Sequence, residues 1–266
     1  MKKILIVLVG LIAVAGLAAC GGEKEGVAYG KVHGQYVGIV TLQVKGGKVT
    51  GGSIDELYLP YNFANVNAQV SGANAAVLEQ VSSDVIGQVN AAGTTTTYFA
   101  KYVKVGDHNV TAETVAGTGE ALNVVYKIGG VDMKEWIATQ ANADAYAKAV
   151  QDGKVFVATS AFAAHATLKS QYAASLNLTG IDQFLKSKTN YGGTNWNWKG
   201  AMAQLVNDVF KGTAMDLNLA NATQVERVVD DKEIKEWHVG DFNTGATLVD
   251  FKDYYNVAKV AFANAK

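Results

Sequence analysis

Residues 241–262 read DFNTGATLVDFKDYYNVAKVAF, and the second part of this stretch carries the clearest helical pattern in the chain. Its apolar residues recur at spacings of three and four, which is the period of one helix face: Leu248, Phe251, Tyr255, Ala258 and Phe262. The polar residues between them fall on the other face: Asp250, Lys252, Asp253, Asn256 and Lys259. The sequence therefore predicts an amphipathic C-terminal helix that begins at about Leu248.

Strand patterns dominate the other end of the chain. Gly34 to Leu59 is rich in strand formers, and Gly46-Gly47 supplies a turn between two runs. Further strands are expected at 98–105, 121–128, 155–157 and, as an antiparallel pair, 225–239. Helices are expected at 71–89, 132–150 with Asp132 as N-cap, and 198–210. Strand groups and helix groups without strict alternation predict an α+β fold, an antiparallel sheet with flanking helices.

The composition excludes several classes of protein. The chain has 266 residues, of which 49% are hydrophobic and 18% charged, so it has enough apolar side chain for a core and is not mainly disordered. Lys and Arg number 23 against 24 Asp and Glu, which argues against nucleic-acid binding. The single cysteine excludes an internal disulfide framework and a cysteine-based zinc site.

The N-terminus has the pattern of an export signal. Met1-Lys2-Lys3 is followed by sixteen uncharged residues, Ile4 to Ala19, which is short for a membrane-spanning helix. Leu17-Ala18-Ala19-Cys20 resembles a bacterial lipobox, and that resemblance implies a lipidated Cys20 as the first mature residue. We therefore predict a lipoprotein signal peptide at 1–19, a lipidated flexible tether at 20–29 and one domain at 30–266. The alternative is an ordinary signal peptide with a chance cysteine.

The common catalytic motifs are missing from the sequence. It contains no phosphate-binding Gly-x-x-x-x-Gly-Lys-Ser/Thr, and Gly117-Thr118-Gly119 lacks the third glycine of a dinucleotide fingerprint. It has no Gly-x-Ser-x-Gly nucleophile elbow, and its four histidines are far apart in sequence. We therefore predict no catalytic residue and no metal site.

Asp241-Phe242-Asn243-Thr244-Gly245-Ala246-Thr247, directly before the last helix, resembles the Asp-x-x-Ser/Thr-Gly-Ala-Thr attachment signature of the FMN-binding domain family. That family includes a flavin-carrying component of the sodium-pumping NADH:quinone reductase and the surface flavoproteins of extracellular electron transfer. The resemblance implies that a flavin transferase links FMN, through its phosphate, to the hydroxyl of Thr247. It also assigns Asp241, Thr244, Gly245 and Ala246 to the attachment site.

The residue types in this motif suit such a linkage. Thr247 carries the required hydroxyl, and the small residues Gly245 and Ala246 leave room for a phosphate and a modifying enzyme. The unpaired N–H groups at the start of the following helix would stabilise the phosphodiester anion. The alternative is a plain helix start at which Thr244 or Thr247 is the N-cap.

Other segments carry weaker likenesses to the same family. Residues 34–38 (GQYVG) and 44–49 (VKGGKV) look like its opening hairpin, and Leu59-Pro60 stands where many members have a Pro-Gly contact to the flavin ring. A plain turn in which the chain leaves the last strand of the hairpin region would explain that proline equally well. Tyr191 and Trp196, with Trp198, are candidates to stack on the flavin, although structural use of these rings is the favoured alternative. Residues 70–74 (VSGAN) echo the signature without the final hydroxyl, so we predict no second FMN.

The resemblance implies an electron carrier with covalent FMN, not an enzyme, with at most incidental reductase activity. The implied partners are a flavin transferase, a quinol-linked membrane donor and an extracellular electron acceptor. The implied location is the outer face of a bacterial cell membrane, reached through the lipid anchor. Two alternatives stay open: a solute-binding lipoprotein of a transporter, and a non-redox surface or adhesive domain.

Overall fold

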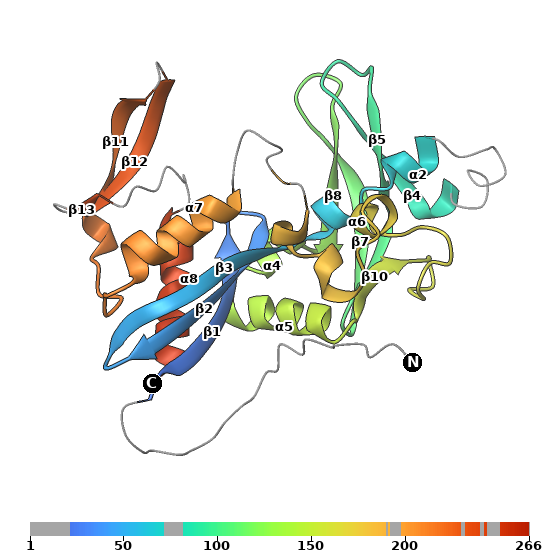
Figure 1. Ribbon diagram of the computed structural model, residues 1–266. Coiled ribbons are helices and arrows are strands. Elements are labelled where there is room, and N and C mark those ends of the chain that lie inside the picture. Colours follow the sequence, from blue (N-terminus) through green and yellow to red (C-terminus); the bar gives the residue numbers. More distant parts are fainter. Residues whose placement is uncertain are drawn as a thin grey trace.

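The computed structural model has the predicted α+β fold, with antiparallel sheets and flanking helices (Figure 1). It describes residues 22–71, 82–189, 191, 198–229, 232–239, 242–243 and 251–265.

The first sheet is an antiparallel meander of β1 (Lys24–Val32), β2 (Tyr36–Lys45) and β3 (Lys48–Tyr58). The predicted hairpin is confirmed, because Gly46 and Gly47 turn between β2 and β3 at φ +59° and +75°, where a side chain would be strained. The predicted tether at 20–29 is wrong from Lys24 onward, since Lys24 already pairs with Val44. The first residues of β1, Lys24-Glu25-Gly26, are not typical of a strand, and pairing with the neighbouring β2 stabilises them as one.

Two helices cover the two faces of this sheet. Helix α8 (Phe251–Asn264) packs against Gly26 and Gly30 of β1, which have no side chain to hold it away. Tyr29 points to the opposite face, where its hydroxyl accepts a hydrogen bond of 2.7 Å from Gln151 Nε2 at the end of α5 (Gln140–Gln151). Figure 1 shows α8 and α5 beside the blue strands of this sheet.

The amphipathic pattern of the last helix is confirmed over the described residues. Phe251, Tyr255, Ala258 and Phe262 are all buried in the core, whereas Asn256 and Lys259 are exposed. The predicted helix start at Leu248 lies outside the described residues. Helix α8 is therefore anchored to the sheet by the apolar face that its sequence spacing indicated.

The second sheet has the strand order β10-β6-β7-β8-β4-β5, with β9 beside β8. Its strands are β4 (Val85–Val89), β5 (Thr96–Ala100), β6 (Tyr102–Val105), β7 (His108–Ala116), β8 (Leu122–Ile128), β9 (Val131–Asp132) and β10 (Val155–Ala158). The predicted helix at 71–89 is wrong at its end, because Val85–Val89 pairs with β5 as a strand. Val85 and Val89 are four residues apart, which fits one face of a helix, but valine is also a strand former.

The predicted helix at 132–150 is divided into α4 (Met133–Trp136) and α5. Asp132 caps α4, as predicted, by accepting a hydrogen bond from the Lys134 backbone N–H at 2.8 Å. The predicted helix at 198–210 is confirmed as α7 (Trp198–Gln204) continued by the π-helical η4 (Leu205–Phe210). The remaining helices are α1 (Pro60–Phe63), α2 (Asn67–Ser71), α6 (Gln171–Ser175), η1 (Ser82–Asp84), η2 (Gly180–Gln183), η3 (Lys186–Lys188) and η5 (Leu219–Asn221).

The third sheet contains β11 (Ala222–Val229), β12 (Lys232–Val239) and the short β13 (Phe242–Asn243). Its first two strands confirm the predicted antiparallel pair. Strand β13 consists of two residues of the predicted attachment motif, and the next described residue is the first of α8.

Candidate functional site

Most of the predicted flavin-attachment residues lie outside the described part of the chain: Asp241, Thr244, Gly245, Ala246 and Thr247, as well as Trp196 and the predicted lipidation site Cys20. The described residues on either side are β13 and α8. Strand β13 pairs with β12 through His238 and Asn243. The ring of Trp237, also on β12, lies 6.4 Å from the ring of Phe251 on α8. The two ends of the intervening segment are thus joined through β12.

A buried ion pair lies close to the described start of α8. Lys186 Nζ of η3 and Glu56 Oε2 of β3 are 2.6 Å apart, and both side chains are 0% exposed. The hydroxyl of Tyr254, on α8, donates a hydrogen bond to the other oxygen of Glu56. A charge pair removed from water is expensive unless it is well hydrogen-bonded, so this arrangement fixes η3, β3 and α8 relative to one another.

Aromatic rings surround the ammonium group of Lys186. Its Nζ lies 4.0 Å from the ring centre of Tyr191, 4.6 Å from that of Tyr36 and 4.9 Å from that of Trp198, distances at which a cation is attracted to a ring face. We call Tyr36, Glu56, Lys186, Tyr191, Trp198 and Tyr254 the Lys186 cluster. Burial, followed by the neighbouring Tyr191 and Glu56, raises the pKa of Tyr36 to about 12.

Of the predicted stacking residues that the structure describes, Tyr191 and Trp198, the fold leaves Tyr191 accessible. Its side chain is 41% exposed, while its ring also lies over the Lys186 cation. Partial burial, and then the charge of Glu56, raises the pKa of its hydroxyl. The fold connects Tyr191 through Lys186 and Glu56 to Tyr254, and hence to the helix that follows the predicted attachment motif.

Trp198 is a core residue, as the favoured alternative had it, because it is only 2% exposed. Its indole N–H has no acceptor among the described residues. A buried donor of this kind costs free energy unless an acceptor reaches it.

Leu59 and Pro60 are not placed as surface contacts for a flavin ring. Both are buried, and they begin α1, with Pro60 in its first turn. The Pro60 carbonyl accepts a hydrogen bond of 3.0 Å from the Ala64 N–H. A proline at the first helical position loses no hydrogen bond. The plain turn from β3 into α1 therefore explains this residue.

Sequence reasoning missed Glu56 and Lys186. On its face of β3, Glu56 lies between the buried residues Ile54 and Tyr58, where a carboxylate facing the core needs a partner. Its partner lies 130 positions along the chain, in a segment without a clear pattern. The position of Glu56 could have indicated a buried charge but not which residue pairs with it.

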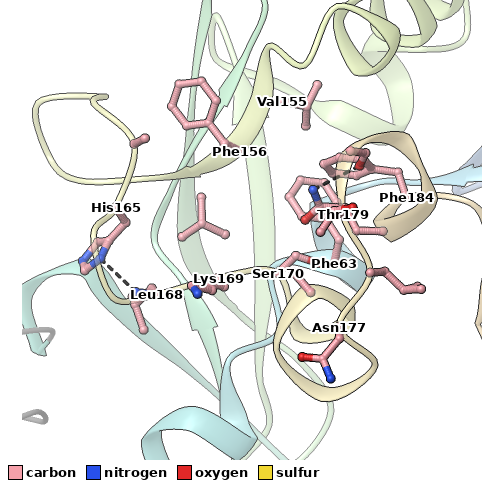
Figure 2. Close-up of a pocket in the computed structure, with 16 residues that line it drawn as sticks. Phe63, Val155, Phe156, His165, Leu168, Lys169, Ser170, Asn177, Thr179 and Phe184 are labelled. Atoms are coloured by element: carbon pink, nitrogen blue, oxygen red, sulfur yellow. Dashed lines mark hydrogen bonds between the residues drawn. The ribbon is translucent and has the colours of Figure 1, made fainter. Parts of the chain in front are cut away.

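A separate cavity of about 490 Å³ lies beside β10, α6 and η2. Figure 2 shows Phe63, Val155, Phe184 and other apolar side chains around it, together with His165, Lys169 and Ser170. Its volume is within the range of small-molecule sites.

Within the described ranges, no group of three or more His, Cys, Asp or Glu side chains could hold a metal ion. No helix in the same ranges combines the length and hydropathy needed to cross a membrane. Comparisons with protein-family models, with curated proteins and with solved structures gave no match to this chain.

Proposed function

We propose that this protein is an electron-carrying flavoprotein in which FMN is attached to Thr247 by a phosphodiester. The observation that carries the proposal is the DFNTGAT motif at 241–247, whose acceptor threonine shortly precedes α8. Helix α8 packs along the first sheet, so an attached group would be held next to a rigid part of the fold. Bound FMN would supply the oxidation and reduction, and the protein would supply position and environment.

A residue connected to the described start of α8 suits a flavin. Tyr191 offers an accessible aromatic face, which a flat ring system can stack upon. The Lys186 cation packs against the Tyr191 ring, and its ion pair with Glu56 fixes that cation in turn. Tyr191 would therefore stack on the flavin ring, and the Lys186–Glu56 pair would keep Tyr191 in place.

The rest of the proposal follows from the sequence motifs. A lipid on Cys20 would anchor the protein to the outer face of a bacterial cell membrane. There it would exchange electrons with a quinol-linked membrane donor and an extracellular acceptor, after modification by a flavin transferase. A covalent bond would prevent the cofactor from diffusing away outside the cell.

Intact mass tests the attachment directly. After co-expression with a flavin transferase and denaturation, we expect a mass gain of one FMN and a yellow polypeptide. Thr247→Ala should remove both, whereas the matched variant Thr247→Ser, which keeps a hydroxyl, should retain some modification. An unmodified wild-type chain would refute the flavin proposal, and a modified Thr247→Ala chain would move the attachment to another residue.

A solute-binding lipoprotein of a transporter is the second candidate function. It is favoured by the cavity beside β10, which is large enough for a small organic molecule. The mass measurement separates the two candidates, because a solute receptor needs no covalent flavin.

A further inference from the structure

We infer that the cavity beside β10, α6 and η2 binds a small organic carboxylate with an apolar body. This site is outside the Lys186 cluster, and the inference does not depend on the flavin proposal. It rests on the shape of the cavity, on the charge of the residues that line it, and on a buried hydroxyl without a partner among the described residues.

The cavity has a firm apolar wall. The rings of Phe63 and Phe184 are packed edge to face with their centres 4.9 Å apart, and both side chains are buried. Val155, Val157 and Leu168 are buried as well and extend this wall. Buried side chains in van der Waals contact keep their positions, so the cavity offers a preformed surface to an aromatic or branched aliphatic group.

The charge of the lining residues favours an anion. Of the described residues that line the cavity, Lys169 alone bears an ammonium group, and none is Asp or Glu. Gln69 holds the Lys169 backbone from both sides, accepting from its N–H at 3.2 Å and donating to its carbonyl at 2.8 Å. The exposed Lys169 side chain makes no ion pair with any described residue, so its charge is available to a ligand.

His165 contributes a neutral edge to the cavity. Its Nδ1 accepts hydrogen bonds from the Leu168 N–H at 3.0 Å and the Thr167 N–H at 3.2 Å, so the ring proton belongs on Nε2. That nitrogen lies 3.4 Å from Asp84 Oδ2, which is not among the lining residues. Because both ring nitrogens of His165 already have partners, His165 cannot accept a proton from the Ser170 hydroxyl and activate it as a nucleophile. We therefore interpret the cavity as a binding site.

Among the described residues that line the cavity, Ser170 is the one with a buried side-chain polar atom that lacks a hydrogen-bond partner. The residue is 5% exposed, and its hydroxyl has no hydrogen-bond partner among the described residues. A serine hydroxyl can rotate between staggered positions, so a carboxylate oxygen in the cavity could provide the missing partner. Lys169 and Ser170 both line the cavity, so we place the carboxylate of the ligand between them.

Calorimetric titration of the purified protein with 3-phenylpropanoate and its uncharged analogue 3-phenylpropanamide tests the inference. We expect the carboxylate to bind about fivefold more tightly than the amide, the effect of one partly exposed charge pair. Lys169→Gln should remove that preference. The matched variant Lys45→Gln, an exposed lysine at the end of β2, should keep it.

A substitution that fills the cavity tests the location of the binding site independently of the charge comparison. Ala173→Phe should abolish binding of both probes, because Ala173 lines the cavity. If that variant does not fold, ligand-induced changes in the amide NMR spectrum of the wild-type protein replace it, and we expect them at Leu168–Ser170 and Asn177–Gly180. Equal binding of acid and amide, no binding of either, or binding that survives in folded Ala173→Phe would each overturn the inference. Thr247→Ala should bind the probes normally, so this result and the flavin result can fail separately.

Discussion

Replacement of Gly26 by alanine tests how α8 is held on the first sheet, and therefore what positions the predicted attachment segment. An added Cβ would lie 2.0 Å from the Ala261 carbonyl oxygen of α8, 2.7 Å from the Ala265 nitrogen and 2.9 Å from the Ala265 Cβ. Ordinary van der Waals contact begins at 3.4 Å, so the closest approach is about 1.4 Å too short. Two of these are backbone atoms, which cannot rotate away as a flexible side chain can.

The cost follows from what would have to move. Strand β1 is paired with β2 from Lys24 to Val32, so the strand cannot shift alone and α8 must move away from the sheet. Overpacking a core costs typically about 1–3 kcal/mol, and we expect the upper end, about 3 kcal/mol of unfolding free energy. That corresponds to a melting temperature roughly 6–12 °C lower, measured by calorimetry or circular dichroism.

Two further glycines provide controls. Gly22→Ala meets nothing within 4 Å and should change the unfolding free energy by no more than about 0.5 kcal/mol. Gly30→Ala would place its Cβ 2.5 Å from Val257 Cγ2, a side-chain methyl, so Val257→Ala should partly rescue it. Because alanine is otherwise at least as favourable as glycine in a strand, a Gly26→Ala protein as stable as the wild type would refute this packing of α8.

Three other predictions concern buried polar groups. Lys186→Met should lower the unfolding free energy by about 3–5 kcal/mol, because it leaves the Glu56 carboxylate buried without its cation; adding Glu56→Gln should restore part of the loss in chemical denaturation. Asp132→Ala should cost about 1–2 kcal/mol in the same assay, since Asp132 caps α4 and accepts a 2.8 Å hydrogen bond from the Tyr61 hydroxyl. The raised pKa of Tyr36, about 12 against the ordinary 10.0, means that the unfolded chain releases this proton first, so stability should fall as the pH rises from 10 to 12. Tyr36→Phe should reduce that fall.

Each of these predictions has an outcome that would count against it. A Lys186→Met protein that is more stable alone than with Glu56→Gln would show that the two charges are not coupled. Asp152→Ala, which removes only an exposed partner of Lys148, is the matched control for Asp132→Ala and should change stability by less than about 0.5 kcal/mol. A tyrosinate absorbance change at the ordinary pKa that disappears in Tyr36→Phe would contradict the burial of that hydroxyl.

Local patterns predicted the elements in which one periodicity or one turn dominates. The stripe from Phe251 to Phe262 requires a helix with one buried face, and Gly46-Gly47 provides the positive φ values that a tight turn between strands needs. Where the sequence of a segment fits more than one secondary structure, the segments packed beside it determine which one forms. Val85–Val89 could continue a helix, but pairing with β5 makes it a strand. The first part of β1, Lys24–Tyr29, resembles a linker in sequence, but its pairing with β2 makes it a strand.

The same division holds for the candidate sites. The sequence by itself determined the α+β class and the last amphipathic helix, and it predicts the attachment motif before that helix, because each depends on residues that are neighbours in the chain. Only the tertiary structure decided that Glu56 and Lys186 form a buried pair under Tyr191 and Tyr254, and that Ser170 lines a cavity with Phe63. The Glu56–Lys186, Glu56–Tyr254 and Phe63–Ser170 pairs each join residues more than a hundred positions apart. Their charges and hydroxyls are removed from water only after the sheets and helices have packed together.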